Sequence, residues 1–346
     1  MKTFIHHDGA LGDVLLSLPA IGLIKRDSGF IHLAARADTA DLLKKAGWVD
    51  RISPAGSSLF LSLHTGNPDA RAVNFLSEFG RAFVFTALED SPFAGNIKRV
   101  VPDTKTVLTI PPGGTGKHVA GFRLAQLQAG SNNQCTQEAT GSCRGKAHCP
   151  GNPLLEFPPV YRKRAEQALS NAGYDNPSVP LIAMHPGSGG TRKRWPIEHF
   201  FELAERMEKD SNPFFIILSG PAENSILGQR IDEFAGSHQR VAHVRNEELV
   251  TVSALLSMCS LYIGNDSGIT HLASSVGGKV IALFGPTDPL LWKPCGHTAH
   301  VVASGMECAP CEQGMPGSSA SGGVPECNQE CLAGITVEKV LEKLLL

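Results

Sequence analysis

Residues that could do chemistry gather in four short stretches, and each stretch directly follows an apolar run. The first stretch is residues 7–13 (HDGALGD). Gly9 and Gly12 allow a sharp turn close to a ligand, and Asp13 stands where a helix is expected to begin. A carboxylate in this place can cap the helix, and it can also take a proton from a bound hydroxyl. The two roles are compatible.

The second stretch, residues 185–196 (HPGSGGTRKRWP), runs from small residues into three consecutive cations. Its Gly and Ser residues offer backbone N–H groups, and Lys193 offers a mobile ammonium, a combination that suits a diphosphate. Most runs of charge are solvated turns, so the small residues around this run are what favours a phosphate site.

The third and fourth stretches, residues 264–271 (GNDSGITH) and 219–223 (SGPAE), have a similar arrangement. The first of these predicts a helix start that would present N–H groups and partial positive charge to an anion, with His271 close by. In the other, Glu223 could accept hydrogen bonds from a ribose diol. Packing would explain a lone His, and capping would explain Asp266 and Glu223. Each stretch alone is therefore weak evidence for a ligand site, and it is the position shared with the other stretches that favours one.

Alternating patterns predict that these stretches lie at the carboxyl ends of parallel strands. In the first half we expect strands at residues 3–6, 31–35, 60–64, 82–86 and 107–110, and helices at 13–25, 39–46, 119–128 and 160–172. In the second half we expect strands at 181–185, 214–219, 241–244, 261–264 and 280–284, and helices at 196–209, 223–235, 249–259 and 269–276. The predicted fold class is α/β, with two doubly wound halves facing a central cleft where ligands bind.

The domain organisation follows from where this alternation stops. We expect an N-terminal domain over residues 1–172, a C-terminal domain over 178–334 and a last helix over 335–346. Residues 130–153 are polar, rich in Gly and Asn, and carry three cysteines, so they form an insert in the first domain.

Composition excludes several classes of protein. The chain has 346 residues, 42% of them hydrophobic, and a net charge of −2. That is enough for two cores, and a basic surface for nucleic acid is not supported. The apolar run at residues 14–24 is too short for a membrane helix and lacks the flanks of a signal peptide, so we expect a cytoplasmic protein.

Familiar nucleotide motifs are missing. Residues 111–118 (PPGGTGKH) depart from a Walker phosphate loop at both ends, and no G-x-G-x-x-G follows an expected strand. A standard NAD site is therefore not predicted.

Four of the nine cysteines, Cys308, Cys311, Cys327 and Cys331, form two close pairs near the end of the sequence. Such a set can bind a structural zinc ion, form two disulfides or stay unlinked. We expect a crosslink remote from catalysis, zinc slightly ahead of disulfides, because a cytosolic enzyme disfavours disulfides. Cys135, Cys143 and Cys149 could do likewise in the insert, with less support.

Longer blocks around these stretches resemble glycosyltransferase family 9, the bacterial lipopolysaccharide heptosyltransferases. The resemblance is carried by residues 9–21, 185–196, 219–223, 265–296 and 307–340. The most specific block is NDSGITHLASSVGGKVIALFGPTDPLLWKPCG at 265–296. The resemblance is poor between about residues 50 and 175, where acceptor specificity would be set.

The resemblance implies a GT-B fold, two Rossmann-like domains with the last helix crossing back to the first. It implies inverting transfer of heptose from ADP-L-glycero-D-manno-heptose to a core sugar of lipopolysaccharide. Asp13 would be the general base on the acceptor loop of Gly9 and Gly12. The residues implied to bind the donor are Lys193 and Ser188 at the diphosphate, Glu223 at the ribose, and Asp266, Ser267, Gly268 and His271 near the phosphates.

The implied partners are the nucleotide-sugar donor and a lipid-linked core oligosaccharide, with transient contact with the inner membrane surface and no nucleic acid. No metal is required for catalysis if protein cations stabilise the leaving diphosphate. Two alternatives stay open: a sugar-nucleotide epimerase or hydrolase of the same fold, and a non-catalytic nucleotide-sugar binding protein.

Overall fold

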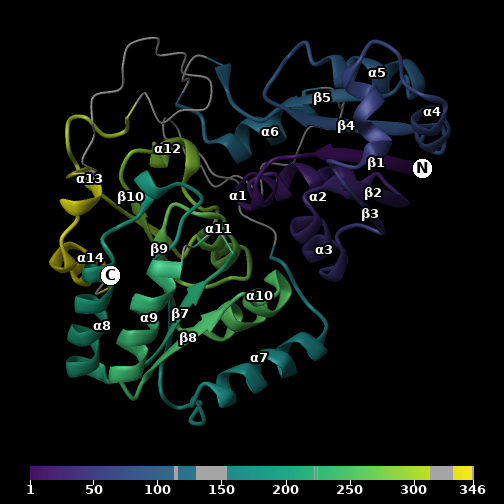
Figure 1. The fold of residues 1–346 in the computed structure, drawn as a ribbon. Helices are drawn as coiled ribbons and strands as arrows, with labels where there is room; N and C mark the ends of the chain where they lie inside the picture. The colour runs from purple at the N-terminus through teal and green to yellow at the C-terminus, as the bar shows by residue number, and fades with distance from the viewer. Residues whose placement is uncertain (113–115, 130–153, 222, 224, 312–329, 345–346) are drawn as a thin grey trace. The chain divides into compact units, whose positions relative to one another are not determined.

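The chain divides into two compact units, residues 1–158 and 159–346, each built on one parallel sheet (Figure 1). The computed structural model describes residues 1–112, 116–129, 154–221, 223, 225–311 and 330–344. The expected insert at 130–153 lies outside these residues.

The first unit has a five-stranded sheet in the order β3-β2-β1-β4-β5. Its strands are β1 (Lys2–His7), β2 (Phe30–Ala35), β3 (Arg51–Pro54), β4 (Arg81–Thr86) and β5 (Thr104–Leu108). All neighbouring pairs are parallel. The strand order reverses between β1 and β4, so the loop after β1 leaves the sheet at the point where ligands of such sheets bind.

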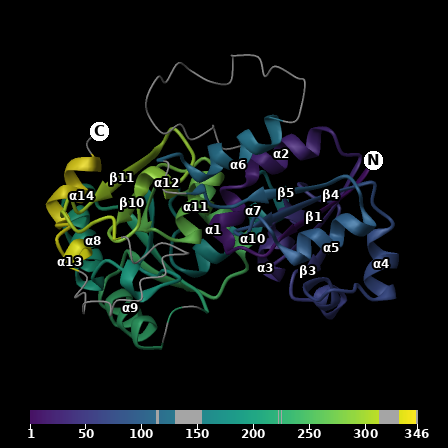
Figure 2. The ribbon, with the colours of Figure 1, turned by 90° about the horizontal axis from the view of Figure 1, so that it is seen from above.

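Helices cover both faces of this sheet. They are α1 (Leu11–Leu15), α2 (Leu18–Arg26), α3 (Ala37–Lys45), α4 (Ala70–Leu76), α5 (Pro92–Val100) and α6 (Val119–Gln128), with the 3₁₀ helix η1 at Ser58–His64. Helices α2 and α6 pack side by side (Figure 2). Under α4, α5 and η1 lies an aromatic core in which the ring of Phe4 lies 5.5 to 5.8 Å from those of Phe60, Phe75 and Phe79.

Helices α4 and α5 of the first unit were not predicted, β5 begins three residues earlier than predicted, and three further elements differ from their prediction. Residues 60–64 form η1 instead of a strand, because the buried residues Phe60 and Leu63 are three apart and Ser57 caps the turn. The helix expected over 13–25 is two helices, since Pro19 cannot continue the hydrogen bonds of α1. Strand β3 escaped prediction because its four residues include one large apolar side chain, Ile52.

The second unit has a six-stranded sheet in the order β11-β10-β9-β6-β7-β8. Its strands are β6 (Leu181–His185), β7 (Phe214–Ser219), β8 (Val241–Arg245), β9 (Leu261–Asn265), β10 (Val280–Phe284) and β11 (Ala299–Ala303). The first five match the prediction, and β11 was not predicted. The order reverses between β6 and β9, which places the ends of these two strands at the switch point of the sheet.

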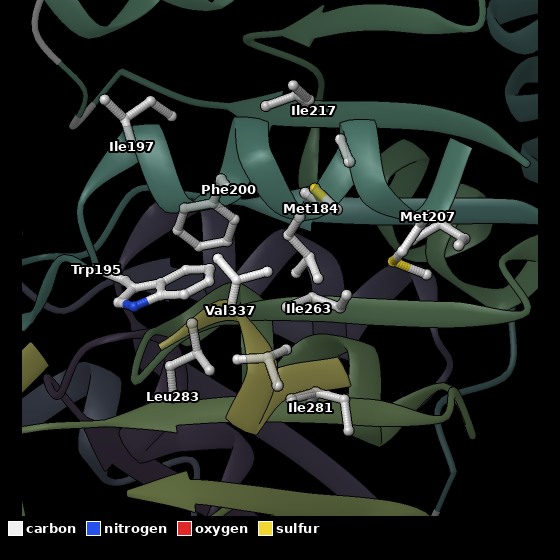
Figure 3. Packing of buried hydrophobic residues seen from close by; sticks show 14 of the residues in the cluster. Met184, Trp195, Ile197, Phe200, Met207, Ile217, Ile263, Ile281, Leu283 and Val337 are labelled. Atoms are coloured by element: carbon white, nitrogen blue, oxygen red, sulfur yellow. The ribbon is translucent and has the colours of Figure 1, made fainter. Parts of the chain in front are cut away.

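The helices of the second unit follow the predicted alternation. They are α7 (Pro159–Asn171), α8 (Ile197–Ser211), α9 (Ser225–Ser237), α10 (Leu249–Met258), α11 (Gly268–Ser275), α12 (Pro289–Trp292), α13 (Glu330–Ala333) and α14 (Val337–Leu344), with the 3₁₀ turn η4 at Thr191–Lys193. The α8–α9 side holds the main core, in which Trp195 and Phe200 meet Ile263 and Val337 (Figure 3).

The expected domain boundary after residue 172 and the expected packing of the last helix both need correction. Helix α7 packs along α10 and belongs to the second unit, so the boundary falls at Pro158 instead of after residue 172. The last helix, α14, packs on α8 and β11, and its residues Val337 and Val340 are buried in the core of the second unit. Within the structure it is therefore part of that unit's core, where we had expected it to pack on the first.

No helix in the described part of the chain combines the length and the apolar character needed to cross a membrane.

Candidate functional site

The loop that carries Asp13 leaves the first sheet at its switch point. The N-cap of α1 is Ala10, which makes no side-chain cap bond, so Asp13 is not the cap and lies within the first turn. A Cβ on Gly9 would lie 2.9 Å from the Cβ of Asp13 and 2.8 Å from Cε1 of His7. A glycine is therefore needed for the backbone to pass this close to Asp13.

A buried arginine from α6 binds Asp13. The Arg123 side chain is 0% exposed, and its Nη2 lies 3.2 Å from Oδ1 of Asp13. Its Nη1 donates to the carbonyl oxygen of Asp13 (2.5 Å) and to Oγ of Ser17 (2.9 Å). The Asp13 side chain is 34% exposed, so the carboxylate is bonded on one side and open to solvent on the other.

His7 supports the same turn from the end of β1. The Gly9 N–H donates to His7 Nδ1 (3.3 Å), so the neutral ring carries its proton on Nε2, 2.9 Å from Ser17 Oγ. Burial, with the charge of Arg123, holds the pKa of His7 well below its ordinary value. The ring is therefore a neutral support and not an acid.

In the second unit, the ends of β6 and β9 are tied together by Asn265. This side chain is fully buried. Its Nδ2 donates to the carbonyl oxygen of Pro186 (2.8 Å), and its Oδ1 accepts from the N–H of Trp195 (2.9 Å). Ser188 adds a bond from its Oγ to the carbonyl oxygen of Asp266 (3.0 Å). The loop that carries Lys193 is thus fixed at both of its ends.

Lys193 and Asp266 form an ion pair at this switch point. Lys193 Nζ lies 2.8 Å from Oδ2 of Asp266, and Thr287 Oγ1 donates to the same oxygen (2.8 Å). Burial raises the pKa of Asp266, but the adjacent His271 and Lys193 outweigh that effect and bring it to about 2. The Asp266 side chain is 8% exposed, whereas that of Lys193 is 36% exposed. The pair therefore presents its cation, and not its carboxylate, to a ligand.

Helix α11 begins beside this pair. Ser267 is its N-cap, and the Oγ of Ser267 accepts from the N–H of Thr270. The first N–H groups, beginning with Gly268, have no acceptor within the helix and carry partial positive charge. His271 is in the first turn, 3.9 Å from Asp266 Oδ1, and its buried Nδ1 has no hydrogen-bond partner in the described part of the chain.

Glu223 is engaged within its own turn. Its side chain is 5% exposed, its Oε2 accepts from the N–H of Gly220 (2.6 Å), and its Oε1 lies 3.8 Å from Nε2 of His185. Burial, with the charge of Arg194, lowers the pKa of His185 to about 4, so this ring is neutral at pH 7. The carboxylate packs directly against Gly187, where a Cβ would lie 2.0 Å from Oε1.

This contact predicts that Gly187→Ala distorts the loop that holds Lys193. Overpacking of this kind costs about 1–3 kcal/mol, so the midpoint of thermal unfolding should fall. The matched control is Gly189→Ala in the same loop, where an added Cβ meets nothing within 4 Å. Equal midpoints for the two variants in a thermal melt would contradict the contact.

The structure brings the expected donor residues Ser188, Lys193, Asp266, Ser267, Gly268 and His271 to one switch point, with Glu223 on the neighbouring strand end. Sequence reasoning missed Asn265, Thr287 and Arg123. The first two lie inside the block at 265–296 and could have been found there. No sequence pattern singles out Arg123, since it is one cation in an ordinary helical stretch.

The cysteine prediction is tested only in part. Cys308 and Cys311 carry free thiols, Cys331 is buried, and Cys327 lies outside the described residues. No group of three or more His, Cys, Asp and Glu side chains is placed to hold a metal within the ranges that the structure describes. The four-cysteine zinc site stays a prediction.

Comparison with known proteins confirms the family resemblance. Residues 151–316, slightly less than half of the chain, match the model of glycosyltransferase family 9 (heptosyltransferase). Lipopolysaccharide heptosyltransferase 2 of Salmonella typhimurium is 30% identical over 198 residues, which are 56% of this chain and 53% of that protein. Lipopolysaccharide heptosyltransferase 1 of Pseudomonas aeruginosa is 28% identical over 46% of this chain and 42% of its own length. The chain spans about half the length of the curated relatives it matches.

Solved structures share the fold over the whole chain. The ADP-heptose lipopolysaccharide heptosyltransferase II of E. coli has a TM-score of 0.70 at 17% identity, covering 100% of this chain and 98% of that one. A family 9 glycosyltransferase from Veillonella parvula has a TM-score of 0.68 at 18% identity, covering 99% and 95%. The predicted α/β class, two doubly wound units of the GT-B type, is confirmed.

Proposed function

We propose that this protein is an inverting glycosyltransferase that moves heptose from ADP-L-glycero-D-manno-heptose to a core sugar of lipopolysaccharide. The observation that carries the proposal is the Lys193–Asp266 pair at the β6–β9 switch point, beside the start of α11. It lies within the range that matches the family model. The E. coli structure named for ADP-heptose shares the fold.

The second unit is the donor-binding unit in this proposal. Lys193 and the N-terminus of α11 at Ser267 and Gly268 bind the diphosphate, and His271 adds its buried Nδ1. Glu223 Oε1 accepts from the ribose, while its Oε2 keeps the bond to Gly220. Ser188 contributes through its backbone, since its hydroxyl is committed to the Asp266 carbonyl. In these assignments a cation and the N–H groups at the start of a helix bind the anionic diphosphate.

The first unit binds the acceptor and supplies the base. Asp13 on the Gly9–Gly12 loop takes the proton of the acceptor hydroxyl through the side of its carboxylate that Arg123 leaves open. The hydroxyl oxygen bonds to the anomeric carbon from the face opposite ADP, and the carbon–oxygen bond to the diphosphate breaks with its electron pair on ADP. Lys193 and α11 stabilise that charge, so the reaction inverts the anomeric centre.

The partners in this proposal are the nucleotide sugar and a lipid-linked core oligosaccharide. The enzyme then works in the cytoplasm with transient contact with the inner membrane surface, and nucleic acid is not a partner. Because Cys308 and Cys311 carry free thiols, Cys308, Cys311, Cys327 and Cys331 are proposed as ligands of a structural zinc ion apart from the reaction, and not as two disulfides.

The proposal is tested first by nucleotide binding. We expect ADP to raise the midpoint of thermal unfolding, and UDP, GDP and CMP to change it much less, because a ligand that binds only the folded state stabilises it in proportion to ln(1 + [L]/Kd). A larger shift with UDP or GDP would overturn ADP-heptose as the donor.

The second test incubates the protein with ADP-heptose, with and without a heptose-free core acceptor. Transfer only in the presence of acceptor, with inverted anomeric configuration, is the expected result. Hydrolysis or epimerisation without acceptor would favour the epimerase or hydrolase alternative. Binding of the donor with no turnover would favour a non-catalytic binding protein.

A further inference from the structure

We propose that Arg123 is a positioning residue that fixes the rotamer of Asp13 and thereby aims one carboxylate oxygen at the acceptor. The inference rests on the proposed role of Asp13 as the base. It adds a requirement for a residue on α6, more than a hundred residues along the chain from the loop that it controls.

The five N–H donors of Arg123 all have acceptors. Nε and Nη2 donate to the carbonyl oxygen of Thr109, at 3.0 and 2.8 Å. Nη1 donates to the Asp13 carbonyl oxygen and to Ser17 Oγ, and Nη2 also donates to Asp13 Oδ1. Because the guanidinium is planar and all of its donors are bonded, it is held in one orientation. Its bonds to Asp13 therefore hold that residue in one orientation as well.

A break in the helix makes the Asp13 carbonyl available to this fork. The N–H of Ser17 bonds to the Val14 carbonyl oxygen at 2.9 Å, so it does not bond to that of Asp13. The break comes at the step before α2, whose second residue is Pro19. Instead, the Asp13 carbonyl accepts from Arg123 Nη1 (2.5 Å) and from Ser17 Oγ (3.0 Å). Arg123 thus holds both the backbone and the side chain of one residue.

Burial decides how Arg123 can act. Its side chain is 0% exposed, so it does not itself meet a substrate. A buried cation is costly unless it is paired and fully bonded, and a well-packed apolar residue would often serve stability as well. The bond to Oδ1 leaves Oδ2 of Asp13 with no hydrogen bond in the described part of the chain, and that oxygen is the one left to take the proton.

Arg123 neither gives nor takes a proton in the reaction. The acceptor O–H bond breaks, and the proton goes to Oδ2 of Asp13. The bond from the acceptor oxygen to the anomeric carbon forms as the bond from that carbon to the diphosphate oxygen breaks. The electron pair of the broken bond leaves with ADP. The effect of Arg123 is on the alignment of Oδ2, and a misplacement of about 1 Å at a reacting group costs about 10²-fold.

The test is a double-mutant cycle on kcat with Arg123→Met, Asp13→Asn and the double variant, once the wild type is shown to transfer heptose. We expect Arg123→Met to lower kcat by about 10²-fold while the KM for donor and the Kd for ADP change less than about twofold. In the Asp13→Asn background the same change should lower kcat by less than about twofold, because the group that Arg123 aims is already disabled.

Two further variants separate positioning from folding. Arg99→Met is the matched control, since Arg99 is an exposed arginine of the same unit whose Nη1 donates to the Gly66 carbonyl oxygen (2.9 Å) and to Asn96 Oδ1 (3.0 Å); it should leave kcat unchanged. Arg123→Lys keeps the charge but lacks the planar fork, so its kcat should still fall about tenfold below that of the wild type. If Arg123→Met does not fold, the cycle is run with Arg123→Lys.

Effects that multiply in the Asp13→Asn background, or a normal kcat in either Arg123 variant, would overturn this inference and leave the proposed function intact. A wild-type protein that transfers no heptose to any core acceptor would instead overturn the proposed function.

Discussion

Asp13→Asn is expected to lower kcat by about 10²- to 10⁴-fold, the range that removal of a general base produces. The amide keeps an oxygen at Oδ1 for Arg123, whose Nη2 lies 3.2 Å from that atom, so the loop should keep its shape. The affinity for ADP should change little, since donor binding is assigned to the other unit. Steady-state transfer assays and calorimetric titration with ADP measure the two quantities.

The matched control is Asp8→Asn, which removes an exposed carboxylate from the same loop. It should transfer at close to the wild-type rate. Near-normal turnover of Asp13→Asn with the natural acceptor would exclude Asp13 as the base, and an equal loss in both variants would point to the charge of the loop instead.

Lys193→Met is expected to weaken ADP binding about tenfold and to lower kcat/KM about 10²-fold. A hydrogen bond to a charged group contributes about 1.5–3 kcal/mol, and the negative charge on the diphosphate grows as the sugar leaves. The substitution also deprives the buried Asp266 of its cation 2.8 Å away, so the thermal midpoint of the free protein must be recorded alongside.

Arg192→Met is the control for this prediction, because it removes the preceding cation, whose Nη2 lies 4.0 Å from the Cys311 sulfur and does not reach Asp266. We expect its ADP affinity to stay within about threefold of the wild type. Unchanged ADP binding by Lys193→Met, or a larger loss in Arg192→Met, would move the diphosphate contact to a neighbouring arginine.

The sequence predicted the positions of candidate site residues where the same residues also mark the end of a strand. The strand end at His185 could be predicted, and the one at Asn265 to within one residue, because small and polar residues follow the apolar runs there. The role of Asp266 could not be decided from the sequence, because a carboxylate before Ser-Gly also fits a helix cap. Only the structure shows that Ser267 caps α11 while Asp266 pairs with Lys193.

Long-range partners escaped prediction for a different reason. Arg123 meets Asp13 across 110 residues, and nothing in a local pattern distinguishes it from an exposed helical cation. The sequence of η1 predicts a strand because a short apolar run fits either structure, and the spacing of Phe60 and Leu63 is decisive only once their burial is known. Helix α14 was assigned to the wrong neighbour because an amphipathic stripe does not specify which core it covers.

The bond from Trp195 Nε1 to the carbonyl oxygen of Ile335 (2.7 Å) has a consequence for biosynthesis. The tryptophan stands two residues after Lys193, and its acceptor is made 140 residues later. Val337 and Val340 close the same core later still. On the ribosome, the segment around Lys193 therefore lacks this anchor until residue 335 has emerged. A nascent chain halted before residue 335 should be recognised by proteases and chaperones as unfinished, even though all six strands of the second unit have already been translated.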